Sequence, residues 1–197
     1  MTAPYASKRL PGQPGGPLLV LLHGTGGTED QFLPLGRQLM PEATLLAPRG
    51  DVSEHGALRF FRRSAEGVYD MADLARATDK MAAFVATEIA ASRPSRVVGL
   101  GYSNGANILA STLFARPDLF DQAVLMHPLI PWTPAPAPVG ARVLITAGQH
   151  DPICPPAATE ALADWFRGQG AAVETLWHPG GHEIARGEIA AIASFLR

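Results

Sequence analysis

A serine between two glycines is the strongest chemical signal in this chain. Ser103 lies in the segment G-Y-S-N-G (101–105), directly after the apolar run 97–100. This matches the G-x-S-x-G pattern, in which a tight turn between a strand and a helix presents a nucleophilic hydroxyl. Glycine and serine are also common in ordinary turns, so the pattern alone is weak. The hydroxyl would need a histidine to take its proton and a carboxylate to orient that histidine.

Two later residues can supply these groups. Asp151 lies in G-Q-H-D-P (148–152), after the apolar run 142–147, and His182 lies in P-G-G-H-E (179–183), after the run 172–177. Taken singly, an aspartate that caps a turn and a solvated surface histidine are the more ordinary interpretations. The order Ser, Asp, His, with each residue just past a predicted strand, is hard to obtain by chance. It predicts a catalytic triad of Ser103, Asp151 and His182 at the carboxyl ends of parallel strands.

A glycine-rich turn supplies a fourth element. The segment H-G-T-G-G (23–27) follows the apolar run 18–22. Backbone N–H groups fixed in such a turn can stabilise the negative charge that develops on a carbonyl oxygen during acyl transfer. The predicted oxyanion-hole donors are the N–H groups of Thr25 and of Asn104, the residue after the nucleophile. A phosphate-binding loop is the alternative, but the spacing gives neither G-x-G-x-x-G nor a P-loop lysine.

The elements that would position these residues follow one another as short apolar runs and longer helical patterns. Such alternation predicts a single α/β domain with a mostly parallel sheet of about six to seven strands, flanked by helices. The expected strands are 18–22, 44–47, 97–100, 123–126, 142–147 and 172–177. The expected helices are 28–40, from a capping box of Thr28 and Gln31, then 70–94, 106–115, 157–166 and 183–196.

The remaining segments are expected to lack regular structure. Residues 1–17 are dense in proline and glycine and are interpreted as a loosely ordered lead-in to a domain spanning 18–197. The arginine-rich stretch 48–69 is interpreted as a loop. The segment 128–140 holds five prolines, which favours a stiff loop over a helical cap domain. The site is therefore expected to be open.

Composition narrows the function classes. With 16 Lys and Arg against 18 Asp and Glu, the chain has no basic field for nucleic acid. Cys154 is the only cysteine, which excludes an intrachain disulfide and a cysteine-based zinc site and fits a cytoplasmic protein. No signal peptide or membrane-inserting segment is visible. The other histidines are scattered, so neither a metal nor another cofactor is expected. An exposed apolar rim around an open site favours a homodimer.

These motifs together resemble the α/β-hydrolase superfamily from Leu18 to Arg197. The chain is more closely similar to the small, capless phospholipase/carboxylesterase group, which includes acyl-protein thioesterases. P-R-G (48–50) followed by R-F-F-R-R (59–63) resembles bacterial carboxylesterases of the hydroquinone-linked type. The resemblance implies a cofactor-free serine esterase acting on small acyl esters.

Several neighbours of the motifs are candidates for substrate binding. Phe32, Phe60, Phe61 and Trp132 are expected near the site and could line an acyl pocket, although simple packing of a helix or loop explains them equally well. Arg59, Arg62 and Arg63 could bind an acidic group of the substrate, because guanidinium groups suit carboxylates. A charged run on a loop is more often merely solvated.

Two other functions fit the same motifs. A thioesterase would use the same triad, and only turnover of matched esters and thioesters would separate the two activities. A non-catalytic binding module could keep the scaffold without the chemistry, but here every triad and oxyanion position is filled. Cys154, three residues after Asp151, is interpreted as a thiol near the site and not as the nucleophile.

Overall fold

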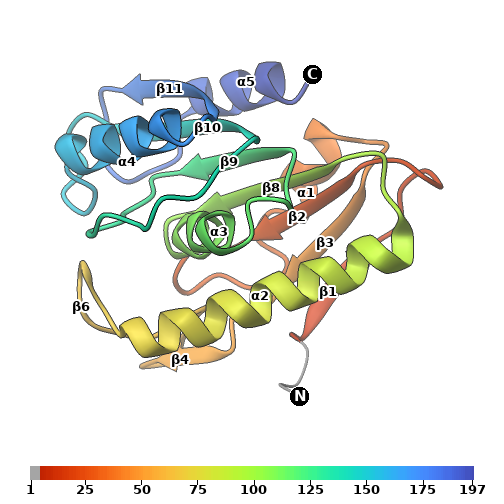
Figure 1. Cartoon of the computed structure of the whole chain (residues 1–197), viewed down its shortest axis with the longest axis horizontal. Coiled ribbons are helices and arrows are strands. Elements are labelled where there is room, and N and C mark those ends of the chain that lie inside the picture. Colours follow the sequence, from red (N-terminus) through yellow and green to blue (C-terminus); the bar gives the residue numbers. More distant parts are fainter. Residues whose placement is uncertain (1–4) are drawn as a thin grey trace.

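A computed structural model, describing residues 5–197, contains one large twisted sheet. Seven strands lie in the order β1-β3-β2-β8-β9-β10-β11 (Figure 1). All neighbours are parallel except β1, which pairs antiparallel with β3 at the edge. In that order the strands span Ser7–Leu10, Thr44–Pro48, Leu18–Leu22, Val97–Tyr102, Gln122–Met126, Arg142–Gly148 and Ala172–His178. The predicted α/β class and mostly parallel sheet are confirmed.

Helices cover both faces of this sheet. On one face pack α2 (Met71–Ser92), α3 (Asn104–Ala115) and α4 (Pro156–Gly168), and on the other α1 (Leu33–Leu39) and α5 (Arg186–Phe195) (Figure 1). Successive side chains of a strand point to opposite faces. In β2, accordingly, Leu18, Val20 and Leu22 enter the core under α2 and α3, whereas Leu19 and Leu21 enter the core under α1 and α5. Burial on both faces explains why the strands are almost continuously apolar.

The long helix α2 begins and ends where its sequence predicts. The Asp70 carboxylate accepts the N–H of Asp73 at 3.0 Å and so caps the first turn. The helix ends at Ser92, and Arg93 then adopts a left-handed conformation with φ of 45°, immediately before Pro94. Pro94 disfavours helical geometry in the residue before it, which explains the stop.

Two expectations near the N-terminus are corrected. Ser7–Leu10 forms an edge strand inside the segment expected to be loosely ordered, because its backbone pairs with β3. The first helix begins at Leu33 and not at Thr28. Gln31, expected to complete a capping box, instead accepts the N–H of Gly24 at 2.9 Å through its side chain. Tertiary contact with the glycine-rich turn thus replaces the local cap.

The stretch 48–69 is also more regular than expected, because it holds two small hairpins. One pairs β4 (Val52–Glu54) with β5 (Ala57–Arg59), and the other pairs β6 (Arg63–Ala65) with β7 (Val68–Tyr69). The first hairpin turns at His55 and Gly56, which both have positive φ, as two-residue hairpin turns require. Strands of two or three residues are too short to show an alternating pattern in sequence. The proline-rich segment 128–140 is a loop, as predicted.

Among residues 5–197, no helix is both long enough and apolar enough to cross a membrane.

The turn between β8 and α3 depends on close approach of two backbone segments. A Cβ atom added to Gly101 would collide with the carbonyl oxygen of Gly105 on the first turn of α3. Only a residue without a side chain lets the helix turn back so tightly onto its strand.

We therefore predict that Gly101→Ala destabilises the fold by about 1–3 kcal/mol, because the backbone must move to admit the methyl group. Urea unfolding followed by circular dichroism measures this loss. Gly140→Ala is the matched control, because a Cβ at Gly140 meets no atom within 4 Å. Equal stability of the two variants would contradict this account of the turn.

Candidate active site

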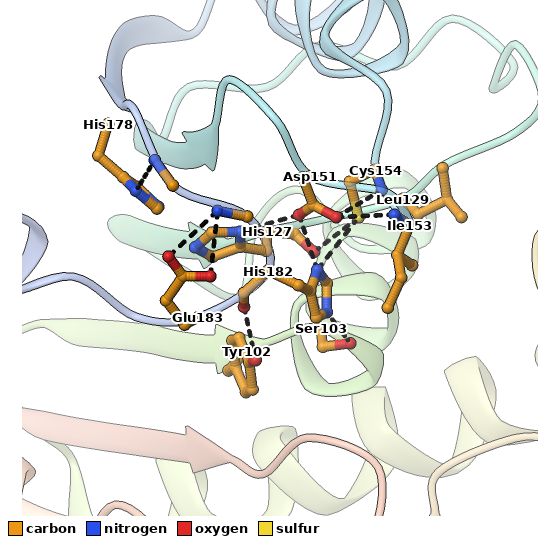
Figure 2. Close-up of polar contacts among 12 residues, drawn as sticks. Tyr102, Ser103, His127, Leu129, Asp151, Ile153, Cys154, His178, His182 and Glu183 are labelled. Carbon is orange, nitrogen blue, oxygen red and sulfur yellow. Dashed lines mark hydrogen bonds and ion pairs between the residues drawn. The ribbon is translucent and has the colours of Figure 1, made fainter.

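Ser103 occupies a strained turn at the carboxyl end of β8. Its φ of 52° and ψ of −116° lie outside the regions that residues with side chains usually adopt. The Ser103 N–H donates to the carbonyl of Met126 on β9 at 2.9 Å, and the Ser103 carbonyl accepts the N–H of Asn107 on α3 at 2.9 Å. These bonds hold the turn between strand and helix. The side chain therefore projects from the sheet edge at which the loops gather (Figure 2).

His182 reaches Ser103 from the loop between β11 and α5. Its Nε2 lies 2.9 Å from Ser103 Oγ, and its Nδ1 lies 2.7 Å from Asp151 Oδ2 (Figure 2). The Tyr102 hydroxyl donates to the carbonyl of His182 at 2.7 Å, and the two rings pack 5.5 Å apart. Tyr102 thus fixes both the backbone and the ring plane of His182. The consistent tautomer carries a proton on Nδ1 and presents the lone pair of Nε2 to the Ser103 hydroxyl.

Asp151 is buried and accepts hydrogen bonds on both carboxylate oxygens. Oδ1 accepts the N–H groups of Ile153 at 2.8 Å and Cys154 at 3.0 Å, while Oδ2 faces His182 and His127. Burial by itself raises the pKa of Asp151, but these hydrogen bonds outweigh it and leave the pKa below its usual value. The carboxylate therefore stays ionised and cannot rotate freely.

The glycine-rich turn leaves one N–H group free beside Ser103. Within it, the N–H groups of Gly24, Gly26 and Gly27 donate to other protein groups, whereas that of Thr25 has no acceptor among the described residues. Asn104 is the first residue of α3, so its N–H has no partner within the helix. Both residues line the cavity at Ser103, which is the arrangement expected of an oxyanion hole.

His23 and Arg59 hold this turn in place. His23 is buried and its Nε2 accepts the N–H of Gly50 at 2.9 Å, so its Nδ1 donates to the Gly24 carbonyl at 2.8 Å. Burial lowers the pKa of His23, which keeps the ring neutral in this role. From the first hairpin, Arg59 Nη1 donates to Thr25 Oγ1 at 2.8 Å, and the Leu58 carbonyl accepts the N–H of Gly26 at 2.9 Å.

The cavity at Ser103 has a volume of about 190 Å³ and a mostly polar wall. Of the residues expected to bind substrate, only Arg59 and Arg63 line this cavity. Phe60 and Phe61 are fully buried in the core. The Phe60 N–H donates to Asn104 Oδ1 at 2.8 Å, which holds this segment against α3. Phe32 packs in the opposite core, against Tyr102. Trp132 packs against Tyr69 and lines a separate groove beside α2 and α3. For these aromatic residues, simple packing is the better explanation.

Of the two neighbouring arginines Arg62 and Arg63, both expected to meet an acidic group, only Arg63 lines the cavity. Arg62 is exposed and pairs with Asp70 and Asp73 at 3.3 Å, outside the cavity. Arg63 lines the cavity but is engaged by the carboxylates of Glu54 and Glu66. The hairpin β6–β7 determines that Arg63 and not Arg62 faces the cavity. The pairing of its two short strands could not be predicted from the sequence.

Several residues of the cavity wall were not anticipated. They are Glu66, Tyr102, Asn107, His127, Leu129 and Ile153. His127 had a usable signal, since it follows β9 directly, just as Ser103, Asp151 and His182 follow predicted strands. Asn107 reaches the site because its Oδ1 accepts the N–H of Leu129 at 2.7 Å, a contact that only the fold creates.

Cys154 lies close to the site but is poorly suited to react. Its Sγ is buried, donates to the His127 carbonyl at 3.3 Å, and lies 3.8 Å from His182 Nδ1 (Figure 2). Burial and the nearby charge of Asp151 hold the pKa of the thiol far above its usual range. At neutral pH the sulfur is therefore a thiol, and the thiolate is the form that attacks.

This fold, with serine, acid and histidine following strands β8, β10 and β11 in that order, defines an α/β-hydrolase. The model of the dienelactone hydrolase family matches residues 58–188. The putative hydrolase MhqD of Bacillus subtilis (strain 168) is 43% identical over 175 residues, covering 87% of this chain and 88% of MhqD.

Two solved structures are similar over nearly the whole chain. A protein of unknown function from Agrobacterium tumefaciens is 59% identical, with a TM-score of 0.95, and the match covers 98% of this chain and 95% of that one. The carboxylesterase of Bacillus cereus is 38% identical, with a TM-score of 0.93 and coverage of 98% and 93%. The chain belongs to the dienelactone hydrolase family and is a hydrolase of the carboxylesterase type.

The environment of Cys154 generates a prediction that needs no substrate. At pH 8 the folded protein should react with a disulfide thiol reagent about 100-fold or more slowly than the urea-unfolded chain, because burial suppresses both access and thiolate formation. Since Cys154 is the only cysteine, the absorbance of the released thiol reports this site alone. Labelling of the folded protein as fast as the unfolded chain would contradict the assignment.

Proposed function

We propose that the protein is a serine carboxylesterase that hydrolyses small acyl esters through an acyl-enzyme intermediate. The single observation that carries the proposal is the continuous chain from Ser103 Oγ through the His182 ring to Asp151 Oδ2, with steps of 2.9 and 2.7 Å. This hydrogen-bonded series ends at a cavity that is also lined by Thr25 and Asn104, the residues that carry the two N–H groups. The similarity to a carboxylesterase 38% identical to it supports the same reaction class.

In the acylation step, Ser103 Oγ attacks the ester carbonyl while His182 Nε2 takes the hydroxyl proton. Asp151 stabilises the resulting imidazolium through the proton on Nδ1. Negative charge moves to the carbonyl oxygen, where the N–H groups of Thr25 and Asn104 stabilise it. His182 then gives its proton to the leaving alcohol, and the C–O bond to that alcohol breaks. Ser103 now carries the acyl group.

Deacylation repeats the same steps with water. His182 takes a proton from the water as its oxygen attacks the acyl carbon, the same N–H groups stabilise the oxyanion, and the proton returns to Ser103 Oγ. The carboxylic acid product leaves the cavity. No step needs a group beyond the protein and water.

Cavity size supports a small substrate. About 190 Å³ lies below the roughly 300–1,000 Å³ of typical small-molecule sites, which suits a short acyl chain. The loop 128–140 adds no helical lid above it. A lipase-like opening at an interface is therefore not part of this proposal.

Arg59 supports a polar or acidic group on the substrate. Its side chain is only 2% exposed, yet it lines the cavity. Nε donates to the Phe61 carbonyl and Nη1 to Thr25 Oγ1, whereas Nη2 has no hydrogen-bond partner among residues 5–197. The nearest carboxylate, Glu54, lies 3.5 Å from Nη1. The free edge of the guanidinium can thus receive a carboxylate oxygen.

The nucleophile is tested by Ser103→Ala, which we expect to lower kcat/KM by about 10³-fold or more while leaving the circular dichroism spectrum unchanged. A short p-nitrophenyl ester is a suitable substrate. Cys154→Ala should keep most of the activity, because the thiol takes no part in the steps above. A phosphonylating reagent should modify Ser103 in the folded wild type. Substantial turnover by Ser103→Ala, or no adduct at Ser103, would refute the mechanism.

Arg59→Met tests recognition of an acidic group. We expect the kcat/KM ratio for a half-ester with a free carboxylate over the matched neutral ester to fall by about tenfold or more, because a charge-assisted hydrogen bond is lost. Damage to the turn at Thr25 would lower both values and leave their ratio unchanged. Arg62→Met, which removes an arginine outside the cavity, is the control. An unchanged ratio in Arg59→Met would exclude this role of Arg59.

A further inference from the structure

A second histidine shares the aspartate of the site. His127 follows β9 and is completely buried. Its Nδ1 lies 3.1 Å from Asp151 Oδ2, the oxygen that also faces His182 (Figure 2). Its Nε2 lies 3.2 and 3.4 Å from the two oxygens of Glu188, which is itself completely buried on the first turn of α5. The mechanism proposed above makes no use of His127 or Glu188.

The geometry favours a proton on each ring nitrogen of His127. Ionised carboxylates accept hydrogen bonds and donate none, so a neutral ring would place a lone pair against a carboxylate oxygen without any solvent. Burial lowers the pKa of His127, but its hydrogen bonds to Glu188 and Asp151 raise it more, and the result lies above the usual value. The same bond to His127 helps to hold the pKa of Glu188 below its usual value against the effect of burial.

The backbone at His127 is consistent with a constrained position. Its φ is 51°, a left-handed value that a residue with a side chain rarely adopts. Ser103, at the end of the neighbouring strand β8, has a φ of 52°. Strain of this kind persists only where the surrounding structure enforces it. Both strained residues point their side chains into one hydrogen-bonded chain.

A metal ion is the obvious alternative for this cluster. Ligand atoms of His127, His178 and Glu188 all lie within 4.8 Å of one another. However, His178 Nδ1 accepts the N–H of Gly180 at 3.0 Å, so the neutral His178 ring carries its proton on Nε2. That nitrogen is the one that lies 3.3 Å from Glu188 Oε1. A metal ion bound to Nε2 of His178 would need a lone pair there, but Nε2 carries the ring proton because Nδ1 accepts the N–H of Gly180. The geometry therefore favours protonated rings over a metal ion in this cluster.

We propose that His127 is a positioning residue, held as an imidazolium between Asp151 and Glu188, that fixes the Asp151 carboxylate and limits the basicity of His182. The proposal rests on the esterase function argued above. With His127 charged, each oxygen of the Asp151 carboxylate accepts two hydrogen bonds. These bonds hold the carboxylate in one orientation. The positive charge also offsets part of the attraction of Asp151 for a proton on His182.

The charged and titratable groups around this pair are few. Around the His127 ring lie Asp151, Glu188, His178, His182 and Tyr102, and Cys154 contacts its backbone carbonyl. The His182 ring faces Asp151, His127, Tyr102 and Cys154. The ring centroids of His127 and His182 are 5.2 Å apart, whereas Glu188 lies on the far side of His127. Loss of the positive charge on His127 therefore acts on His182 from a shorter distance than loss of the negative charge on Glu188. The change at His127 has the larger electrostatic effect on His182.

Glu188→Gln is the discriminating variant. The glutamine keeps the shape of the side chain and an oxygen for the N–H of Ala185, which Glu188 Oε1 accepts at 2.5 Å. Its amide can donate to His127 Nε2, so His127 becomes neutral and still donates from Nδ1 to Asp151. His182 then loses a positively charged neighbour whose ring centroid lies 5.2 Å away. We expect the acidic limb of the kcat/KM profile to move to higher pH by about one unit, with the plateau changed by no more than a few-fold.

Glu183→Gln is the matched control. Glu183 follows His182 in sequence but is exposed and accepts only the N–H of Gly181 among the described residues (Figure 2). Its removal should leave the acidic limb in place. A role of Glu188 in folding alone would lower the rate equally at every pH and would not move the limb. An unmoved limb in Glu188→Gln would overturn the proposal.

A second measurement does not depend on turnover. In wild-type protein labelled with ¹⁵N-histidine, one buried ring should keep an imidazolium spectrum, with both nitrogens protonated, above the pH at which exposed histidine rings become neutral. That spectrum should become neutral in Glu188→Gln. Only neutral rings in the wild type, or a spectrum reorganised by stoichiometric zinc, would overturn the proposal even if the enzyme is an esterase. A persistent imidazolium in an inactive protein would instead refute the esterase function and leave the charge state of His127 standing.

Discussion

The Asp151 carboxylate is buried and accepts four hydrogen bonds, and these bonds fix the parts of the site relative to one another. Its Oδ1 binds two N–H groups of its own turn, and its Oδ2 binds His182 and His127. Three separate loops therefore meet at one ion. Burial of a carboxylate without these donors would destabilise the fold by several kcal/mol. The arrangement of the loops after β9, β10 and β11 therefore depends on Asp151.

This convergence follows from the register of the parallel sheet. β8, β9, β10 and β11 are hydrogen-bonded neighbours, and each ends at the same edge with a polar residue or loop of the site. Parallel strands bring residues that lie far apart in sequence to one line of carboxyl ends. The helices on both faces bury the strands, which gives short loops a rigid base. Rigidity matters here because a serine hydroxyl is activated only by correctly placed partners.

The small hairpins in the stretch 48–69 give the site its particular character. Through Arg59 and Leu58, the first hairpin binds the turn that carries Thr25, and through Arg63 and Glu66 the second contributes charged groups to the cavity wall. A largely polar cavity results, in a place where the sequence suggested aromatic lining. Phe60 and Phe61 instead pack in the core that supports the hairpins.

The sequence by itself determined the α/β class, the order of the strands' polar ends and the identity of Ser103, Asp151 and His182 as residues that meet, because these follow from local apolar runs and glycine turns. Only the tertiary structure decided that Arg63 and not Arg62 enters the cavity, that Gln31 binds Gly24 instead of capping a helix, and that His127 joins Asp151 to Glu188. Each of these depends on a contact between segments distant in the chain. Local spacing carries no information about such contacts, since burial and competing hydrogen-bond partners are properties of the folded molecule.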